Sequence, residues 1–419
     1  MKDRFRLLRE RLGEQLWIKP LFMCLISIVG VFITKTADST KLGEFVPDIL
    51  EESINTLLST MSASMLVIAT FAVGTMVTSY AAASSKATPR SFSLVIADDV
   101  SQNALSAFIG SFIYSVVGLI ALENGYFERA GRFALFALTL MVFALVILTF
   151  VRWLDRIARL GRIQTTIDSV ENATCESLQR RKETRRLGGI PISLKEQGLT
   201  PVFSKDIGYL QCIDMASLQE KAEKHKMSIR VVSLPGTFCT PNKVLAYVWP
   251  ESHNSDATLD NMALDKMSDS FVVGRQRTFA DDPRFGLIVL SEIASKALSP
   301  AVNDPGTAIN IIGSQLRLLS DWSVDCEHRQ PVKYNRIEVP ELLSRDMLDD
   351  AFTAIARDGS GLVEVVIRLQ KPLHSLATVG DKGIASSALE HARMVQIRAE
   401  ASLKLDEEKA AVRAAQSQG

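Results

Sequence analysis

Two polar segments contain the residue types that could bind a ligand or an ion. The longer segment runs from residue 275 to residue 307 and combines arginines, neighbouring acids and a loop of amide, hydroxyl and carboxylate groups. Its candidate binding or interface residues are Arg275, Arg277, Asp281, Asp282, Ser299, Asn303, Asp304 and Thr307. Exposed backbone amides at the start of a helix can hold an anion, so this segment could form a binding site near its arginines.

The loop at 299–307 also has a purely structural interpretation. The prolines at 300 and 305 rule out a continuous helix through it. Asp304 could cap a helix that begins at Pro305, with the proline in the first helical position. A turn with a cap, and a binding site near Arg275 and Arg277, therefore both stay open.

The second polar segment joins two apolar runs and contains Arg90, Asp98, Asp99 and Gln102. Arg90 can reach either carboxylate only if the chain folds back after Pro89, which can end or reorient a helix. Negative charge is favourable at the start of the helix that follows. One interpretation is a cap and a salt bridge that fix a helical hairpin, and the other is a ring of charge at the cytoplasmic mouth of a channel.

Motifs for other chemistry are missing from the sequence. It has no phosphate-binding or dinucleotide-binding glycine motif, and its five cysteines lack the paired spacing of metal ligands. We therefore expect neither a catalytic residue nor a metal site, and the cofactor stays unknown. The 47 basic and 47 acidic residues balance to zero net charge, which argues against a nucleic-acid partner.

Four apolar runs must position the second polar segment. They cover residues 17–34, 54–80, 104–122 and 133–151, and a helix needs about 20 apolar residues to cross a bilayer. Basic residues concentrate before the first run and after the fourth, which predicts that both termini are cytoplasmic. The sequence thus predicts a four-helix transmembrane bundle in contact with the lipid bilayer.

Small residues recur every four positions in the second and third runs, as Thr70, Gly74 and Thr78 and as Ala107, Ser111 and Ser115. Such stripes allow two helix backbones to approach closely. They could serve packing within the bundle, or they could line a pore or a seam between copies of the chain.

The rest of the chain reads as a C-terminal cytoplasmic α+β domain. We expect a transmembrane domain at 1–155, a basic juxtamembrane helix and linker at 156–189, the α+β domain at 190–380 and a helical tail at 381–419. Residue types and periodicity predict strands at 227–234, 243–249 and 362–369. They predict helices at 214–226, 285–298, 304–321 and 342–357, and one long helix at 383–414.

The most specific blocks of the sequence carry a family resemblance. They are Thr88-Pro89-Arg90 with Asp98-Asp99, the run 208–214, Pro235-Gly236-Thr237-Phe238, and the block from Arg277 to Ala308 that contains Ser299-Pro300-Ala301-Val302-Asn303-Asp304-Pro305-Gly306. In order and spacing the chain resembles the bacterial family called Domain of Unknown Function 2254. Ala301 departs from it, because a glycine is common at that position. The resemblance implies a multi-pass protein of the bacterial inner (plasma) membrane with a soluble domain, and it implies no activity.

These observations favour a homo-oligomeric channel or conductance regulator with a cytoplasmic sensing domain, for an unknown ion or ligand. The alternative is a membrane-anchored protein that binds a ligand or acts as a scaffold. A membrane enzyme is the least favoured class, since no catalytic set is evident.

Overall fold

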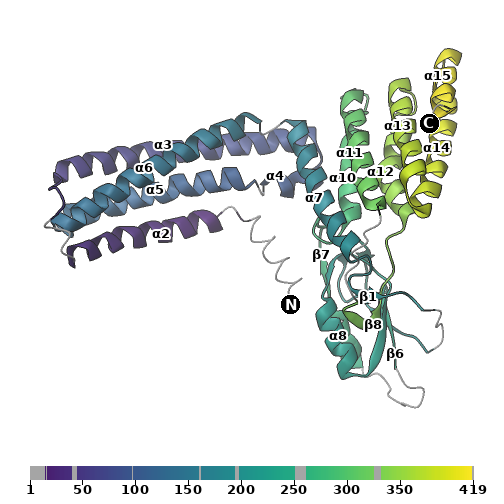
Figure 1. Cartoon of the computed structure of the whole chain (residues 1–419), viewed down its shortest axis with the longest axis horizontal. Coiled ribbons are helices and arrows are strands. Elements are labelled where there is room, and N and C mark those ends of the chain that lie inside the picture. Colours follow the sequence, from purple (N-terminus) through teal and green to yellow (C-terminus); the bar gives the residue numbers. More distant parts are fainter. Residues whose placement is uncertain are drawn as a thin grey trace. The chain divides into compact units, whose positions relative to one another are not determined.

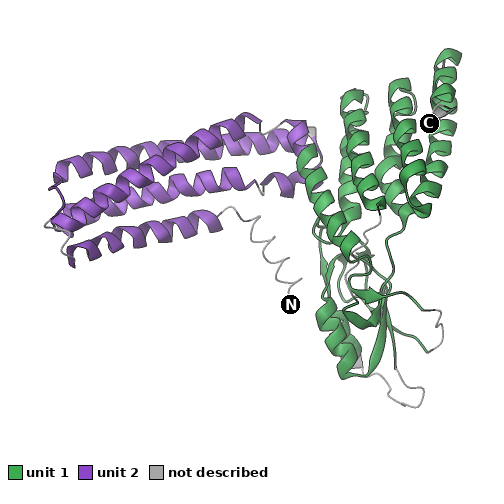
Figure 2. Ribbon diagram, in the orientation of Figure 1, with its two compact units in different colours: residues 1–9, 167–419 green, residues 10–166 purple. Residues whose placement is uncertain are grey.

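The computed structural model describes residues 15, 17–39, 45–96, 98–159, 162–193, 198–250, 261–324 and 332–417. The chain divides into two compact units (Figure 2), and each is described by itself. The first, here called the apolar unit, lies within residues 10–166. The second, here called the sheet unit, contains residues 167–419.

Long apolar helices make up the apolar unit. In its described part, four helices are long and apolar enough to cross a membrane: α2 (Ile18–Thr34), α3 (Glu51–Lys86), α5 (Asp99–Glu123) and α6 (Arg129–Arg159). Short turns η1 (Lys35–Ser39) and η3 (Pro89–Ser91) and the helix α4 (Phe92–Ile96) connect them. Apolar side chains point away from the unit on α2, α3 and α6, as expected for helices that contact lipid.

Helix α5 is the inner helix of this unit. In its most apolar stretch 56% of the residues are buried, against 11–22% in the other three helices. Small residues make this possible: a Cβ added at Gly110 would lie 3.1 Å from the Cβ of Met23, and one at Gly118 would lie 3.2 Å from Leu58. Ala107, Ser111 and Ser115 are buried on the same helix, and such small side chains let neighbouring helices approach closely.

Two sheets share the core of the sheet unit. One has the order β1 (Gly189–Ile190), β8 (Tyr334–Glu338), β4 (Met227–Val231), β6 (Val244–Pro250) and β2 (Thr200–Phe203). The other has the order β5 (Phe238–Cys239), β3 (Gly208–Ile213) and β7 (Phe271–Gly274). Buried apolar residues of both sheets form one cluster with α8 (Met215–Lys224) and α9 (Asn261–Ser268). Strand β8 pairs in parallel with β1 and β4, whereas β6 pairs antiparallel with β4 and β2.

The helices of the sheet unit from residue 283 onward stand side by side as successive hairpins (Figure 1). The helices are α10 (Pro283–Ala297), α11 (Pro305–Ser323), α12 (Ser344–Asp358), α13 (Val363–Val379), α14 (Lys382–Ser402) and α15 (Asp406–Ser417). Helices α10, α12 and α14 pack in one layer, and α11, α13 and α15 pack in a second. Each hairpin thus buries its apolar side against the next one.

The strand predicted at 362–369 is wrong, because Val363–Val379 forms helix α13. Its valines and isoleucine have high β propensity, but its buried residues Val365, Val366, Leu369, Leu373 and Leu376 recur with helical spacing. Tertiary packing of that face overrides the local preference. The long helix predicted at 383–414 is instead two helices, α14 and α15, and they dock on α12 and α13 of the same chain.

Gly189 lies where the linker before the soluble domain was expected. It belongs to β1, and a Cβ there would lie 2.5 Å from the carbonyl oxygen of Ile337. Only glycine permits this close approach of two backbones. Helix α7 (Ile163–Glu183) precedes it.

Candidate functional site

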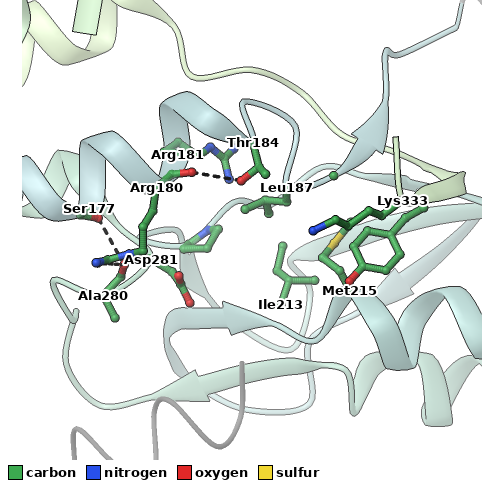
Figure 3. Close-up of a pocket in the computed structure, with 13 residues that line it drawn as sticks. Ser177, Arg180, Arg181, Thr184, Leu187, Ile213, Met215, Ala280, Asp281 and Lys333 are labelled. Atoms are coloured by element: carbon green, nitrogen blue, oxygen red, sulfur yellow. Dashed lines mark hydrogen bonds between the residues drawn. The ribbon is translucent and has the colours of Figure 1, made fainter. Parts of the chain in front are cut away.

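A cavity of about 180 Å³ lies in the sheet unit beside the C-terminal half of α7 (Figure 3). Five further segments complete its lining: the turn between α7 and β1, the end of β3 with the start of α8, the Pro235 turn, the loop before α10 and the start of β8. The lining residues are Ser177, Arg180, Arg181, Thr184, Leu187, Gly188, Ile213, Met215, Pro235, Ala280, Asp281, Lys333 and Tyr334. Apart from Asp281, none of them was a candidate from the sequence.

Helical periodicity places Arg181 in the interior. The buried face of α7 carries Ile167, Val170, Thr174 and Leu178, and the next turn of the same face carries Arg181. Close packing against α10 keeps this face covered, since a Cβ added at Gly286 would overlap the side chain of Thr174. This cationic side chain therefore occupies a position where the helical pattern predicts an apolar side chain.

Within the described part of the chain, the guanidinium of Arg181 has no hydrogen-bond partner. The residue is 4% exposed, and its Nε, Nη1 and Nη2 atoms are all buried and find no acceptor among the described residues. Burial lowers the pKa of Arg181 to about 10, and the charges of Asp281, Glu341 and Asp282 oppose that shift. It stays protonated at neutral pH, so the cavity wall holds an unpaired positive charge.

Two of those carboxylates already have a cation of their own. Asp282 accepts hydrogen bonds from Nε and Nη2 of Arg277, at 2.7 and 2.9 Å. Glu341 lies 2.6 Å from Nη2 of Arg186. The charges of these two carboxylates therefore act on Arg181 through space, and neither carboxylate accepts a hydrogen bond from it.

Side chains on the polar side of the cavity donate hydrogen bonds to backbone carbonyl oxygens. Arg180 donates from Nη2 to the carbonyl oxygen of Ala280 at 2.8 Å, and the hydroxyl of Ser177 donates to the same oxygen at 3.3 Å. The hydroxyl of Thr184 donates to the carbonyl oxygen of Arg180 at 3.1 Å. Figure 3 shows Ser177, Arg180, Ala280 and Asp281 on one side and Leu187, Ile213 and Met215 on the other.

The buried ion pair of Arg277 and Asp282 lies next to the residues that line the cavity. Asp282 caps α10 by accepting a hydrogen bond from the backbone of Phe285, and desolvation by burial raises its pKa, while the contact with Arg277 lowers it. Gly236 has a φ of +96°, and a Cβ there would lie 2.5 Å from Oδ2 of Asp282. Only glycine fits at this turn, so the pair sets the position of neighbouring Pro235.

The structure separates the candidate residues of the longer polar segment. Asp281 lines the cavity, and Arg277 and Asp282 lie beside it, whereas Arg275 is exposed. The 299–307 loop follows the far end of α10, and 15 residues of helix at 1.5 Å each separate the two groups by about 22 Å. A role of that loop in binding stays a prediction.

The 299–307 loop has the geometry of a turn and a cap. Asp304 accepts hydrogen bonds from the backbone and the hydroxyl of Thr307, at 3.1 and 2.6 Å, and these bonds lower its pKa. Asn303 adopts a φ of +50°, and the hydroxyl of Ser299 donates to the carbonyl oxygen of Lys296. The loop thus joins α10 to α11.

The second polar segment lies at one end of the apolar unit. Asp98 caps α5 through Ser101, and it forms an ion pair of 2.6 Å with Arg156 of α6. Asp99 lies 2.5 Å from the ammonium of Lys19, and Gln102 donates to the carbonyl oxygen of Ile96. Arg90 is exposed next to Pro89. The salt bridge of Asp98 therefore joins α5 to α6.

The two stripes of small residues face different surroundings. Ala107, Ser111 and Ser115 are buried within the apolar unit. Thr70, Gly74 and Thr78 are exposed on α3, and a Cβ added at Gly74 would meet no atom of the described residues within 4 Å. Both threonine hydroxyls donate to carbonyl oxygens of α3 itself. Among the described residues, no group of three or more His, Cys, Asp or Glu could hold a metal ion.

Apolar helices of membrane-spanning length and a cavity with a buried cation define a membrane protein that carries a second unit with a candidate binding site. Among known families, the chain belongs to the one described as predicted membrane protein (DUF2254), whose model matches residues 13–375. The family expected from the sequence is thereby confirmed. Its description assigns no activity.

Two curated relatives share the same degree of similarity. Uncharacterized protein Mb1321c of Mycobacterium bovis and Uncharacterized protein Rv1290c of Mycobacterium tuberculosis are each 25% identical over 323 residues, which is 74% of this chain. The match covers 61% of the length of each relative. No solved structure matches the chain.

Proposed function

We propose that the chain is a membrane-anchored receptor whose soluble unit binds a small anion beside Arg181. The unpaired, buried guanidinium of that residue carries the proposal. A buried charge without a partner costs several kcal/mol, and proteins keep such costs mainly where function needs them. A bound anion supplies the missing acceptors and offsets the cost.

The surroundings of Arg181 support a ligand site over a structural ion pair. A structural pair would place a carboxylate within hydrogen-bond distance, as Asp282 does for Arg277 at 2.7 Å. Arg181 has no such acceptor among the described residues, and it borders an open volume of about 180 Å³. Perturbed charged groups that line a cavity are typical of binding and active sites.

Topology is part of the proposal. The chain crosses the bacterial inner membrane through α2, α3, α5 and α6, and its basic flanks keep both termini in the cytoplasm. The receptor cavity then samples cytoplasmic anions. Reporter fusions test this arrangement: an enzyme reporter active only in the cytoplasm should be active after Gly189 and inactive after Gly125, and the reverse result contradicts it.

A homo-oligomeric channel is the second candidate. The exposed stripe of Thr70, Gly74 and Thr78 favours it, because small residues on an outer helix face permit close approach of another helix. Ala107, Ser111 and Ser115 do not support a pore, since they are buried by neighbouring helices of the same chain. Ion flux into liposomes that contain the purified protein would favour the channel, and its absence would favour the receptor.

The experiment for the receptor uses the full chain in detergent. The melting temperature is measured with benzoate, acetate, inorganic phosphate and phenyl phosphate, for the wild type, Arg181→Met and Arg345→Met. Arg345 is the matched control, because its side chain is 65% exposed and pairs with Glu390 on the surface. We expect at least one anion to stabilise the wild type and the control but not Arg181→Met. If no anion gives a shift that depends on Arg181, the proposal is wrong.

A further inference from the structure

We infer that the ligand of the Arg181 cavity is an organic monocarboxylate with an apolar body about the size of one ring. This inference rests on the proposed receptor function and names its ligand class. The charges, the apolar wall and the volume of the cavity each contribute an independent argument.

The charged groups that line the cavity suit a ligand with a single negative charge. Three cations line it, Arg180, Arg181 and Lys333, against one carboxylate, Asp281. Arg180 lies 3.7 Å from Glu176 and donates from Nη2 to a backbone carbonyl, although its Nε has no acceptor among the described residues, and Lys333 has an interaction partner. Arg181 is the cavity cation whose whole guanidinium lacks an acceptor among the described residues. A second negative charge on the ligand would meet Asp281 without a free cation to balance it.

The apolar wall requires a ligand with an organic body. Leu187, Ile213, Met215, Pro235 and Tyr334 line the cavity, and Ile213 and Met215 are each only 4% exposed. An inorganic ion would leave this surface against water. Burial of an apolar group here contributes favourable free energy in proportion to the area covered.

Volume limits the size of that body. The cavity measures about 180 Å³. A benzene ring fits a protein cavity of roughly 150 Å³, so one ring with a carboxylate uses the available space. Ligands the size of a nucleotide exceed it.

The donors that remain in the cavity suit a carboxylate. A guanidinium presents a planar fork of N–H groups that matches the two oxygens of a carboxylate. The hydroxyls of Ser177 and Thr184 already donate to backbone carbonyl oxygens. Recognition of the anionic group therefore falls to Arg181, and selection of the body falls to the apolar wall.

The test is isothermal titration of the full chain in detergent with compounds that differ in one feature each. Benzoate has the ring and one charge, benzamide has the ring without charge, and acetate has the charge without the ring. Phenyl phosphate and inorganic phosphate replace the carboxylate. We expect benzoate to bind most tightly and each of the others to bind at least about tenfold more weakly, the difference that one lost hydrogen bond or apolar contact makes.

Two variants of Arg181 connect this selectivity to the cavity. Arg181→Met should weaken benzoate binding about 100-fold, since two charge-assisted hydrogen bonds are lost. Arg181→Lys should recover part of the loss, because it restores the charge without the planar fork. Met215→Gln should weaken benzoate but not acetate, because it changes only the apolar wall. Arg345→Met should leave all affinities unchanged.

The possible failures are distinct. If a phosphate compound binds more tightly than benzoate and its binding depends on Arg181, the carboxylate class is wrong and the receptor function stands. If benzamide binds as tightly as benzoate, recognition of charge is wrong. If no compound binds in a way that depends on Arg181, both the ligand class and the receptor function are wrong.

Discussion

Replacement of Arg181 by methionine should make the protein more stable while it removes ligand binding. Methionine keeps a long, flexible side chain that can fill the space of the arginine stem. It removes a buried charge that has no hydrogen-bond acceptor in the described parts of the chain. Most substitutions of buried residues destabilise a protein, so an increase in stability is a specific outcome.

The structure sets the size of the effect. The pKa of Arg181 is lowered from 12.5 to about 10, and at about 1.4 kcal/mol per unit this disfavours the charged form by roughly 3 kcal/mol. Because the pKa is lower in the folded state, the cost is fully present at pH 7. Two of the three nearby acids do not become unpaired in the variant, since Asp282 keeps Arg277 and Glu341 keeps Arg186. We expect stabilisation of about 1–3 kcal/mol, within the range for replacement of buried charges by apolar residues.

Thermal unfolding of the full chain in detergent, followed by circular dichroism at pH 7, measures this effect. An increase of about 2–10 °C in melting temperature corresponds to that free energy for a unit of this size. Arg277→Met is the contrasting variant, because it leaves the carboxylate of Asp282, with its side chain 2% exposed, without its cation. That change should destabilise the protein by about 3–5 kcal/mol.

The two arginines should therefore respond with opposite signs. A decrease in melting temperature for Arg181→Met, similar to that of Arg277→Met, would refute the reasoning. It would mean that Arg181 has a structural partner and that the cavity does not need an anion. An unchanged melting temperature would also contradict the calculated cost.

Substitutions at four other positions test single features, by the same unfolding measurement at Gly236 and Asp304 and by the yield of folded protein at Ala107 and Gly74. Gly236→Ala should destabilise the protein by at least about 1 kcal/mol, because its φ is +96° and the new Cβ would overlap Asp282; a neutral result would mean that the turn can shift. Asp304→Asn should cost little and Asp304→Ala about 0.5–2 kcal/mol, because asparagine caps a helix as well as aspartate does; equal costs would contradict the cap. Ala107→Leu should disrupt packing of the buried helix α5 and lower expression of folded protein, whereas Gly74→Leu, on an open face, should not; equal effects would contradict the assignment of faces.

Elements whose signals are local could be predicted from the sequence. The four apolar helices follow from length and composition alone, and the structure contains them. Asp304 before a proline predicts a helix start, and it does cap α11. In both cases the information lies within one helix, so no tertiary contact is needed to interpret it.

Features that depend on tertiary packing could not be predicted. The run that forms α13 is rich in β-branched residues, and only its neighbours α11 and α14 make the helix favourable. Arg181 belongs to a run of basic residues at 180–182 and 185–186, and such side chains are mostly exposed in proteins. Its position on the buried stripe of α7 was the available signal, but burial on that side depends on α10 and Gly286.

The arrangement of the hairpins determines how far local unfolding spreads through the sheet unit. The α14–α15 pair packs on α12 and α13, whereas α10, which begins beside the cavity, packs on α11 and α12. In such a stack each repeat is stabilised by its own fold and by its contacts with the adjacent repeats. The last hairpin can therefore open and close as a separate cooperative unit, with amide hydrogens that exchange sooner than those of α10. A destabilising substitution in the last hairpin should therefore loosen only that end of the stack, and the fold around Arg181 should keep its stability.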